Sequence, residues 1–192
     1  MNAALKYAVL ASLIAAPAMA ADKYEIDPQH AWVTFKVNHA GWSKAHGLFQ
    51  KVAGTIDFDK QDVTKSSINL TIDTNSISTN FEQRDSDLKS PDFLNADEFP
   101  QITFKSTGVQ KTGDKTGKVT GDLTLAGVTK PVTLDVTWNA ESPLPWDAKT
   151  IKTGFSATTS FDAVSTFGLK KLADYGLGPN IAFDIDIEAI KQ

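Results

Sequence analysis

Apolar and polar residues alternate at every second position through most of this 192-residue chain. The clearest case is residues 181–188, where isoleucine or phenylalanine fills every odd position and alanine, aspartate or glutamate every even one. Successive side chains of a β-strand point to opposite faces, so this pattern predicts a strand with one apolar face. Eight segments show it, namely residues 33–38, 56–59 (preceded by a strand-like 46–49), 68–73, 102–105, 119–125, 132–138, 155–161 and 181–188. Nearly all are polar on one side, which is typical of an antiparallel sheet with one solvated face.

The connections between these predicted strands contain turn-forming residues. Residues 112–117 (TGDKTG) predict a polar hairpin loop, and residues 126–129 (AGVT) predict the next tight connection. Pro131 falls at the start of the following predicted strand, where its missing N–H is tolerated. Because the chain has no repeat, low-complexity tract or linker, we expect one domain over residues 21–192.

Eight strands with one apolar face can form either a sandwich or a closed up-and-down barrel. A barrel leaves no exposed strand edge, and eight strands enclose space for packed side chains or one small ligand. Gly121 and Ala157 are small inward-facing positions at which a lumen could open. The alternation by itself does not distinguish a filled interior from a hollow one.

One segment has helical spacing. Phenylalanine, arginine, aspartate and leucine occupy positions 81, 84, 85 and 88, before Ser90-Pro91 ends the pattern. Asn80 is the expected N-cap, with Gln83 at the third helical position of a capping box. A second region, residues 162–179, is expected to be irregular.

The first twenty residues have the organisation of a secretory signal peptide. Lys6 precedes an apolar run at residues 7–16, and Ala18-Met19-Ala20 fits a small-x-small cleavage site. The run is far shorter than the ~20 apolar residues that a membrane-spanning helix needs, and no later segment approaches that length. We therefore expect export, cleavage after Ala20 and no stable membrane insertion, with a periplasmic location if the source is Gram-negative.

Composition and motifs exclude several function classes. The net charge of −4 argues against nucleic-acid binding, and the absence of cysteine removes disulfides, thiolate metal sites and a cysteine nucleophile. There is no Gly-x-Ser-x-Gly elbow and no phosphate-binding glycine loop. The three histidines, His30, His39 and His46, lack a metal-binding spacing. We predict no metal, no cofactor and no catalytic residue.

Three stretches resemble the YceI-like family, secreted bacterial proteins also described as polyisoprenoid-binding or lipocalin-like. They are residues 27–39 (DPQHAWVTFKVNH) followed by Gly47-Leu48-Phe49, residues 76–80 with 84–94 and 99–107, and residues 120–134 (TGDLTLAGVTKPVTL). Their order and spacing match the family over essentially the whole chain after residue 20. Members often carry histidine where this chain has Asp87, so no role for that imidazole carries over.

The resemblance implies an all-β fold: an eight-stranded antiparallel up-and-down β-barrel, lipocalin-like, with a short helix packed beside it. It also implies a long apolar tunnel that holds a polyisoprenoid, an isoprenoid quinone or a fatty amide. The resulting hypothesis is a periplasmic carrier of a long-chain amphiphile that performs no covalent chemistry. Dimerisation into a homodimer is a hypothesis that rests on the family alone.

The alternation and the resemblance together nominate ligand-binding residues, each of which could instead be ordinary core. Candidates for the tunnel lining are Phe35, Phe58, Ile72, Phe104, Leu123, Leu134, Trp138, Phe155, Phe161 and Phe183. Phe81, Leu88 and Phe93 could close one mouth from the helical segment. Arg84 and Asp85 could face a polar head group, although a structural salt bridge or backbone clamp is favoured.

Two alternatives remain open at this point. The barrel could be filled, which would favour a stress-response or interaction module without a lipid ligand. The protein could also be an enzyme that modifies an isoprenoid inside the tunnel. That activity would need a titratable cluster facing the lumen, for which the sequence offers only His30, His39, Arg84 and Asp85.

Overall fold

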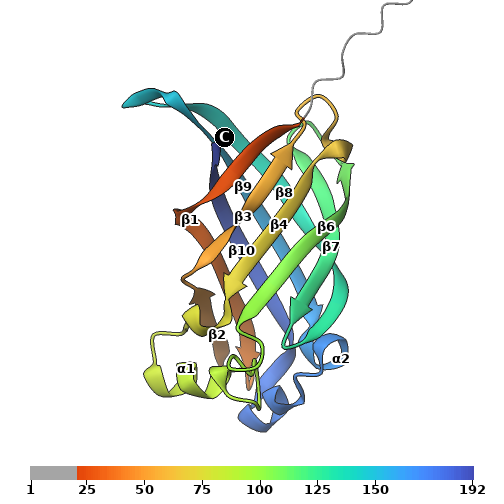
Figure 1. Ribbon diagram of the computed structural model, residues 1–192. Coiled ribbons are helices and arrows are strands. Elements are labelled where there is room, and N and C mark those ends of the chain that lie inside the picture. The colour runs from red at the N-terminus through yellow and green to blue at the C-terminus, as the bar shows by residue number, and fades with distance from the viewer. Residues whose placement is uncertain (1–20) are drawn as a thin grey trace, which may run out of the picture.

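The computed structural model describes residues 21–192, in which ten strands form a single closed antiparallel sheet (Figure 1). The predicted signal peptide, residues 1–20, lies outside the described residues. The strands are β1 (Asp22–His39), β2 (Ser43–Phe49), β3 (Val52–Phe58), β4 (Ser67–Asp73), β5 (Ile77–Ser78), β6 (Gln101–Lys111), β7 (Thr116–Leu125), β8 (Val128–Leu144), β9 (Asp147–Asp162) and β10 (Leu177–Lys191). The helices are α1 (Glu82–Lys89) and α2 (Ala163–Phe167), with short 3₁₀ turns η1 (Val63–Lys65), η2 (Thr74–Ser76) and η3 (Lys170–Tyr175).

Pairing between the first and last long strands closes the barrel. β10 pairs with β1 along most of its length, for example Phe35 opposite Phe183, while its other edge pairs with β9. The remaining order runs β9-β8-β7-β6-β4-β3-β1, so eight strands form the wall. Closure satisfies the hydrogen-bonding groups that an open sheet would leave on its edges. The predicted eight-stranded antiparallel barrel is confirmed, with β2 and β5 as two additional short strands.

The two additional strands arise because two wall strands are interrupted at the same level. β1 pairs with β3 through its first residues, with Tyr24 opposite Ile56, and with β2 through its last, with Phe35 opposite Gly47. β2 pairs in turn with β5, and β3 with β4. β2 and β3 therefore follow one line along β1. The strand-like segment 46–49 lies in β2, and the strand predicted at residues 56–59 corresponds to the end of β3.

Several strands are longer than the alternation predicts. β1 begins at Asp22 and contains a bulge between Ile26 and Ala31, which interrupts the period of two. β8 continues to Leu144 and β9 begins at Asp147, so the hairpin that they form projects from one end of the barrel (Figure 1). The end that carries this hairpin and the β6–β7 loop (residues 112–115) is called the open end below.

The tight connection expected at residues 126–129 is a two-residue turn between β7 and β8. Ala126 and Gly127 have φ of 47° and 75°, the left-handed pair of a type I′ turn, whose twist suits a hairpin. Pro131 is the fourth residue of β8 and not its first, so that part of the prediction is wrong. Its missing N–H is tolerated because β9 pairs with β8 only from Asp135 onward.

The opposite end, called the closed end below, is covered by helices (Figure 1). The expected helix is present as α1, but the predicted Asn80 N-cap is wrong. Asn80 adopts φ of 60° and Phe81 occupies the cap position without a side-chain cap. The region expected to be irregular contains α2, which begins where the Asp162 carboxylate accepts hydrogen bonds from the Val164 and Ser165 N–H groups.

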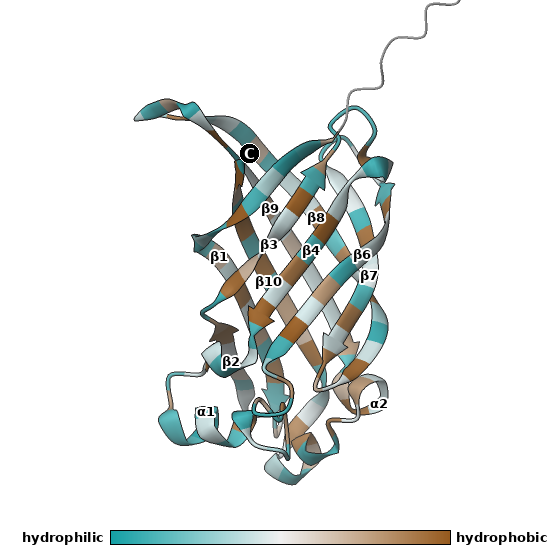
Figure 2. Ribbon diagram, viewed as in Figure 1, coloured by the Kyte–Doolittle hydropathy of each residue, from teal (hydrophilic) through white to brown (hydrophobic). Residues whose placement is uncertain are grey.

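The strands of the barrel wall show the alternation of hydropathy that the sequence predicts. Along the strands, apolar and polar residues alternate in Figure 2, and the inward-facing apolar side chains form one continuous core cluster that includes Tyr24, Ile56, Ile102 and Leu172. No helix in residues 21–192 is long and apolar enough to cross a membrane.

Candidate functional site: an apolar cavity along the barrel

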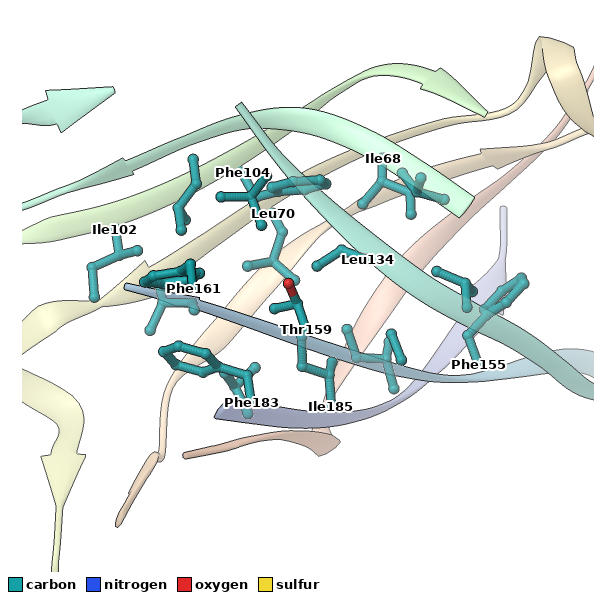
Figure 3. Close-up of a pocket in the computed structure, with 18 of the residues that line it drawn as sticks. Ile68, Leu70, Ile102, Phe104, Leu134, Phe155, Thr159, Phe161, Phe183 and Ile185 are labelled. Carbon is teal, nitrogen blue, oxygen red and sulfur yellow. The ribbon is translucent and has the colours of Figure 1, made fainter. Parts of the chain in front are cut away.

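A cavity of about 230 Å³ runs along the inside of the barrel from the open end to the closed end. Every wall strand contributes side chains to it, and Figure 3 shows phenylalanine, isoleucine and leucine side chains converging on its middle. Twelve of the fifteen nominated binding residues line it: Phe35, Phe58, Ile72, Leu88, Phe93, Phe104, Leu123, Leu134, Trp138, Phe155, Phe161 and Phe183. Contact with a ligand stays a prediction for each of them.

Two of the hydroxyl-bearing residues that line the cavity, Ser66 and Thr159, take part in hydrogen bonds with the barrel wall. The Thr159 hydroxyl, labelled in Figure 3, donates to the Thr133 carbonyl at 2.9 Å. Near the open end, the Ser66 hydroxyl accepts a hydrogen bond from the Asp59 N–H at 3.0 Å. Because phenylalanine, isoleucine and leucine side chains line the middle of the cavity, it favours a chain without polar groups.

The two small inward positions behave differently. Ala157 lines the cavity, as expected of a position where the lumen could open. Gly121 does not, because the Phe104 ring fills that space: a Cβ at Gly121 would lie 2.5 Å from Phe104 Cζ. The expectation that Gly121 widens the lumen is therefore wrong; the glycine makes room for a cross-strand aromatic ring.

Apolar side chains seal the closed end. Leu94, Leu169 and Leu172 line the cavity there and are buried. Phe93 is also buried and packs edge-on against Tyr175, with ring centroids 5.3 Å apart. Leu88 and Phe93 thus lie where the sequence placed them, at one end of the tunnel. Phe81 does not line the cavity and is 59% exposed.

The open end is polar and solvent-exposed. Lys111, Asp114 and Lys115 are the titratable side chains that line the cavity within residues 21–192, and all three belong to the β6–β7 hairpin. The Lys115 ammonium lies 5.6 Å from the centroid of the Trp138 ring and donates to the Asn139 carbonyl at 3.1 Å. This geometry is a cation–π contact, and it holds a positive charge over the mouth.

Below this lysine lies an aromatic collar formed by Phe58, Trp138 and Phe155. The Phe58 ring packs edge-on against both partners, with centroid distances of 5.4 Å to Trp138 and 5.2 Å to Phe155. The Trp138 indole N–H donates to the Thr153 hydroxyl at 3.1 Å, which fixes the ring orientation. Apolar ring faces therefore begin immediately inside the charged mouth.

A hydrogen-bonded network ties the base of the projecting hairpin to β1. The fully buried Tyr24 donates its hydroxyl to Glu141, and Lys60 donates to the same carboxylate at 2.7 Å. Burial raises the pKa of Tyr24, and its hydrogen bond to the Glu141 carboxylate raises that pKa further. The phenol consequently stays protonated and keeps donating. No sequence signal links Tyr24 to a residue 117 positions away.

Arg84 and Asp85 lie outside the cavity lining and hold a backbone segment in place. Arg84 donates to the Thr79 hydroxyl at 2.8 Å and to the Thr79 carbonyl at 2.7 Å. Asp85 accepts from the Thr79 N–H at 2.7 Å and from its hydroxyl. These four bonds to one residue fit the backbone clamp that the sequence favoured over a head-group contact.

His30 is the one histidine that joins a charged cluster in the described residues. Its ring meets Asp27 and Glu188, and the Lys152 ammonium donates to both carboxylates at 2.6 and 2.7 Å. Because a cation already bridges the two acids, the arrangement is an ion-pair network. Burial opposes ionisation of Asp27, but hydrogen bonds from Lys152, His30 and the Gln29 N–H lower its pKa to about 2.

The fold and cavity define a class: a closed antiparallel β-barrel with an apolar lumen, sealed at one end and charged at the other. Comparison with known proteins narrows this class. The YceI-like domain model matches residues 24–189. A UPF0312 protein from Pseudomonas savastanoi pv. phaseolicola is 42% identical over 187 residues, covering 95% of this chain and 93% of its own. The chain belongs to the YceI-like family.

Solved structures share the barrel. Burkholderia cenocepacia BcnA aligns with a TM-score of 0.74 at 20% identity, covering 85% of this chain and 98% of its own. A polyisoprenoid binding domain from Saccharophagus degradans aligns with a TM-score of 0.61 at 16% identity, covering 88% and 98%. At these identities the likeness is one of fold.

Proposed function

We propose that this protein binds one long-chain amphiphile of the polyisoprenoid class and carries it through the periplasm without chemical change. The apolar tail would lie inside the barrel and the head group at the β6–β7 mouth. The observation that carries the proposal is the continuous apolar cavity, whose titratable lining residues, Lys111, Asp114 and Lys115, are gathered at one end.

The energetics support retention of a chain in this cavity. Each methylene removed from water stabilises the complex by ~0.8 kcal/mol, so a few isoprene units offset the cost of immobilising a ligand. A volume of about 230 Å³ is small for a ligand pocket. The cavity therefore suits a thin, flexible chain better than a broad ring system.

The same geometry argues against the two alternatives. A filled barrel would have no continuous cavity, and the lumen here is lined from end to end. An isoprenoid-modifying enzyme would need titratable groups along the chain, but His30, His39, Arg84 and Asp85 all lie outside the lining. The titratable residues that do line the cavity belong to the β6–β7 hairpin at the mouth, away from the apolar middle. The polyisoprenoid binding domain of S. degradans, which shares the fold, makes polyisoprenoids the first ligands to test.

Native mass spectrometry of the purified protein with a polyprenol tests the proposal. Ala157→Phe adds a ring inside the lumen, whereas Thr158→Phe adds the same ring at the next, exposed position of β9. We expect a one-to-one complex for the wild type and Thr158→Phe, and its loss for Ala157→Phe. The spectra also count protomers, which tests the homodimer hypothesis.

Absence of any co-purifying lipid, together with no saturable binding of polyprenols, quinones or fatty amides, would refute the proposal. Equal binding by Ala157→Phe and Thr158→Phe would place the ligand outside the lumen. The proposed periplasmic location has its own test: the N-terminal residue of protein recovered from the periplasmic fraction should be Ala21.

A further inference from the structure

Two tryptophans of the described chain are almost fully exposed, and they lie at opposite ends of the barrel. Trp146 is 81% exposed and occupies the turn between β8 and β9 at the open end. Trp42 is 83% exposed and lies between β1 and β2, where the neighbouring Ala40 N–H donates to the Gly176 carbonyl of the closed end. Because their exposed fractions are nearly equal, Trp42 at the closed end is a matched control for Trp146 at the open end.

The β8–β9 hairpin carries Trp146 beyond the cavity mouth. The backbone N–H of Trp138, a residue of the aromatic collar, donates to the Lys115 carbonyl at 2.7 Å, which places Trp138 level with the β6–β7 loop. β7 stops pairing with β8 at Thr137, and β10 stops pairing with β9 at Lys152. The hairpin continues past both as a two-stranded ribbon on the same end as the mouth (Figure 1).

This ribbon is held at its base and at its tip. Glu141 joins it to Tyr24 and Lys60 of the barrel. In the turn, the Asp147 carboxylate accepts from the Lys149 N–H at 3.1 Å and from the Thr150 hydroxyl at 2.6 Å. The Trp146 ring is therefore presented to solvent from a structured turn.

The chemistry of the tip is apolar and nearly neutral. Residues 143–149 read Pro-Leu-Pro-Trp-Asp-Ala-Lys, with one acid and one base. A tryptophan in such a setting favours the head-group zone of a bilayer, where its ring is buried and its N–H stays hydrated. A stable protein–protein interface buries roughly 800 Å² on each partner and is built around several buried side chains, whereas the one exposed aromatic ring of this tip is that of Trp146.

We propose that the β8–β9 tip docks on a phospholipid bilayer through Trp146 and so brings the cavity mouth to the lipid surface for loading and release. The purpose of this contact rests on the proposed function, but the contact itself needs no bound ligand. Because the tip has no net charge, hydrophobic insertion and not attraction to anionic lipid drives it.

Flotation of the purified protein with phosphatidylcholine vesicles tests the docking. We expect Trp146→Ser to lower the vesicle-bound fraction about tenfold, the effect of losing one partly buried aromatic ring, and Trp42→Ser to leave it unchanged. Brominated phosphatidylcholine should quench the fluorescence of the wild type and of Trp42→Ser more strongly than that of Trp146→Ser. Raising the salt to ~0.5 M should change little.

A second assay separates this inference from the proposed function. Transfer of a fluorescent polyprenyl lipid between vesicles should slow for Trp146→Ser, while both variants bind polyprenol in solution as the wild type does. Vesicle docking without any polyprenol binding would refute the function and leave the docking intact. Equal flotation of Trp146→Ser and the wild type, the same loss for Trp42→Ser, or dissociation by salt would overturn the docking.

Discussion

The two ends of the barrel are built from opposite chemistry. At the closed end, buried leucines and Phe93 line the end of the lumen, on the side where the helices lie. At the open end, Lys111, Asp114 and Lys115 line the mouth, and the Lys115 ammonium lies over the Trp138 ring of the aromatic collar. The difference gives the cavity a direction. In the function proposed above, the apolar tail of the ligand lies inward and its head group lies at the lysines.

The largest effect is expected where the closed end is opened. Phe93→Ala removes a buried ring that packs on Tyr175 and should lower the free energy of unfolding by about 3–5 kcal/mol. Lys115→Ala at the open end should change it by less than about 0.5 kcal/mol. Urea unfolding of both variants makes the comparison. Equal losses would mean that the two ends do not differ in this way.

Acid should first destabilise the ion-pair network around Asp27. The pKa of Asp27 is lowered from 3.8 to about 2, so its ion pair stabilises the fold above pH 4 and is lost as the pH falls toward 2. The shift corresponds to about 2 kcal/mol. Hydrogen exchange in this range should rise in β9 around Lys152 before it rises in α2.

Asp27→Asn supplies the control for this acid effect. The variant should be less stable at neutral pH and lose less further stability between pH 4 and pH 2. An unchanged acid profile would show that the network of Asp27, Lys152 and Glu188 does not govern acid stability.

The clamp on Thr79 gives a smaller expected change. Arg84→Ala removes two hydrogen bonds and should cost about 1–2 kcal/mol of stability while leaving polyprenol affinity unchanged. Thermal unfolding and a binding titration on the same sample distinguish the roles. A loss of affinity with unchanged stability would favour the head-group contact instead.

The smallest effect concerns the lysines of the mouth. Lys115→Gln should weaken binding of a polyprenyl phosphate by about threefold, because an exposed charge contact contributes less than about 1 kcal/mol. Binding of the uncharged polyprenol should stay the same. A matched change at the exposed Lys130, which does not line the cavity, should affect neither ligand.

The strands of the barrel wall were predictable because the alternation of apolar and polar residues within each strand shows which of its faces is buried. The period of two identified Phe104, Leu134 and Phe183 as inward without knowledge of any partner strand. It could not decide whether the interior is hollow, because this depends on how side-chain volumes from all the walls add up. Gly121 shows the difficulty: a ring from the neighbouring strand fills the space that its missing side chain leaves.

Features that depend on distant partners left no local signal. Asp27 meets Lys152 across 125 residues, and Tyr24 meets Glu141 across 117. The prediction of an Asn80 helix cap is wrong because of a contact between residues that are close in the sequence. Asp85, inside α1, reaches back to the Thr79 N–H, and this clamp replaces the Asn80 cap that the sequence favoured.

A crystal structure of the protein with a bound polyprenyl phosphate would show directly whether the ligand lies in the lumen and in which direction. We expect continuous density along the barrel, with the phosphate beside Lys111 and Lys115 and the tail running past Phe58 and Phe155 toward Phe93. A lumen that excludes the ligand, or a phosphate seated at the helical end with its tail toward Trp138, would contradict it.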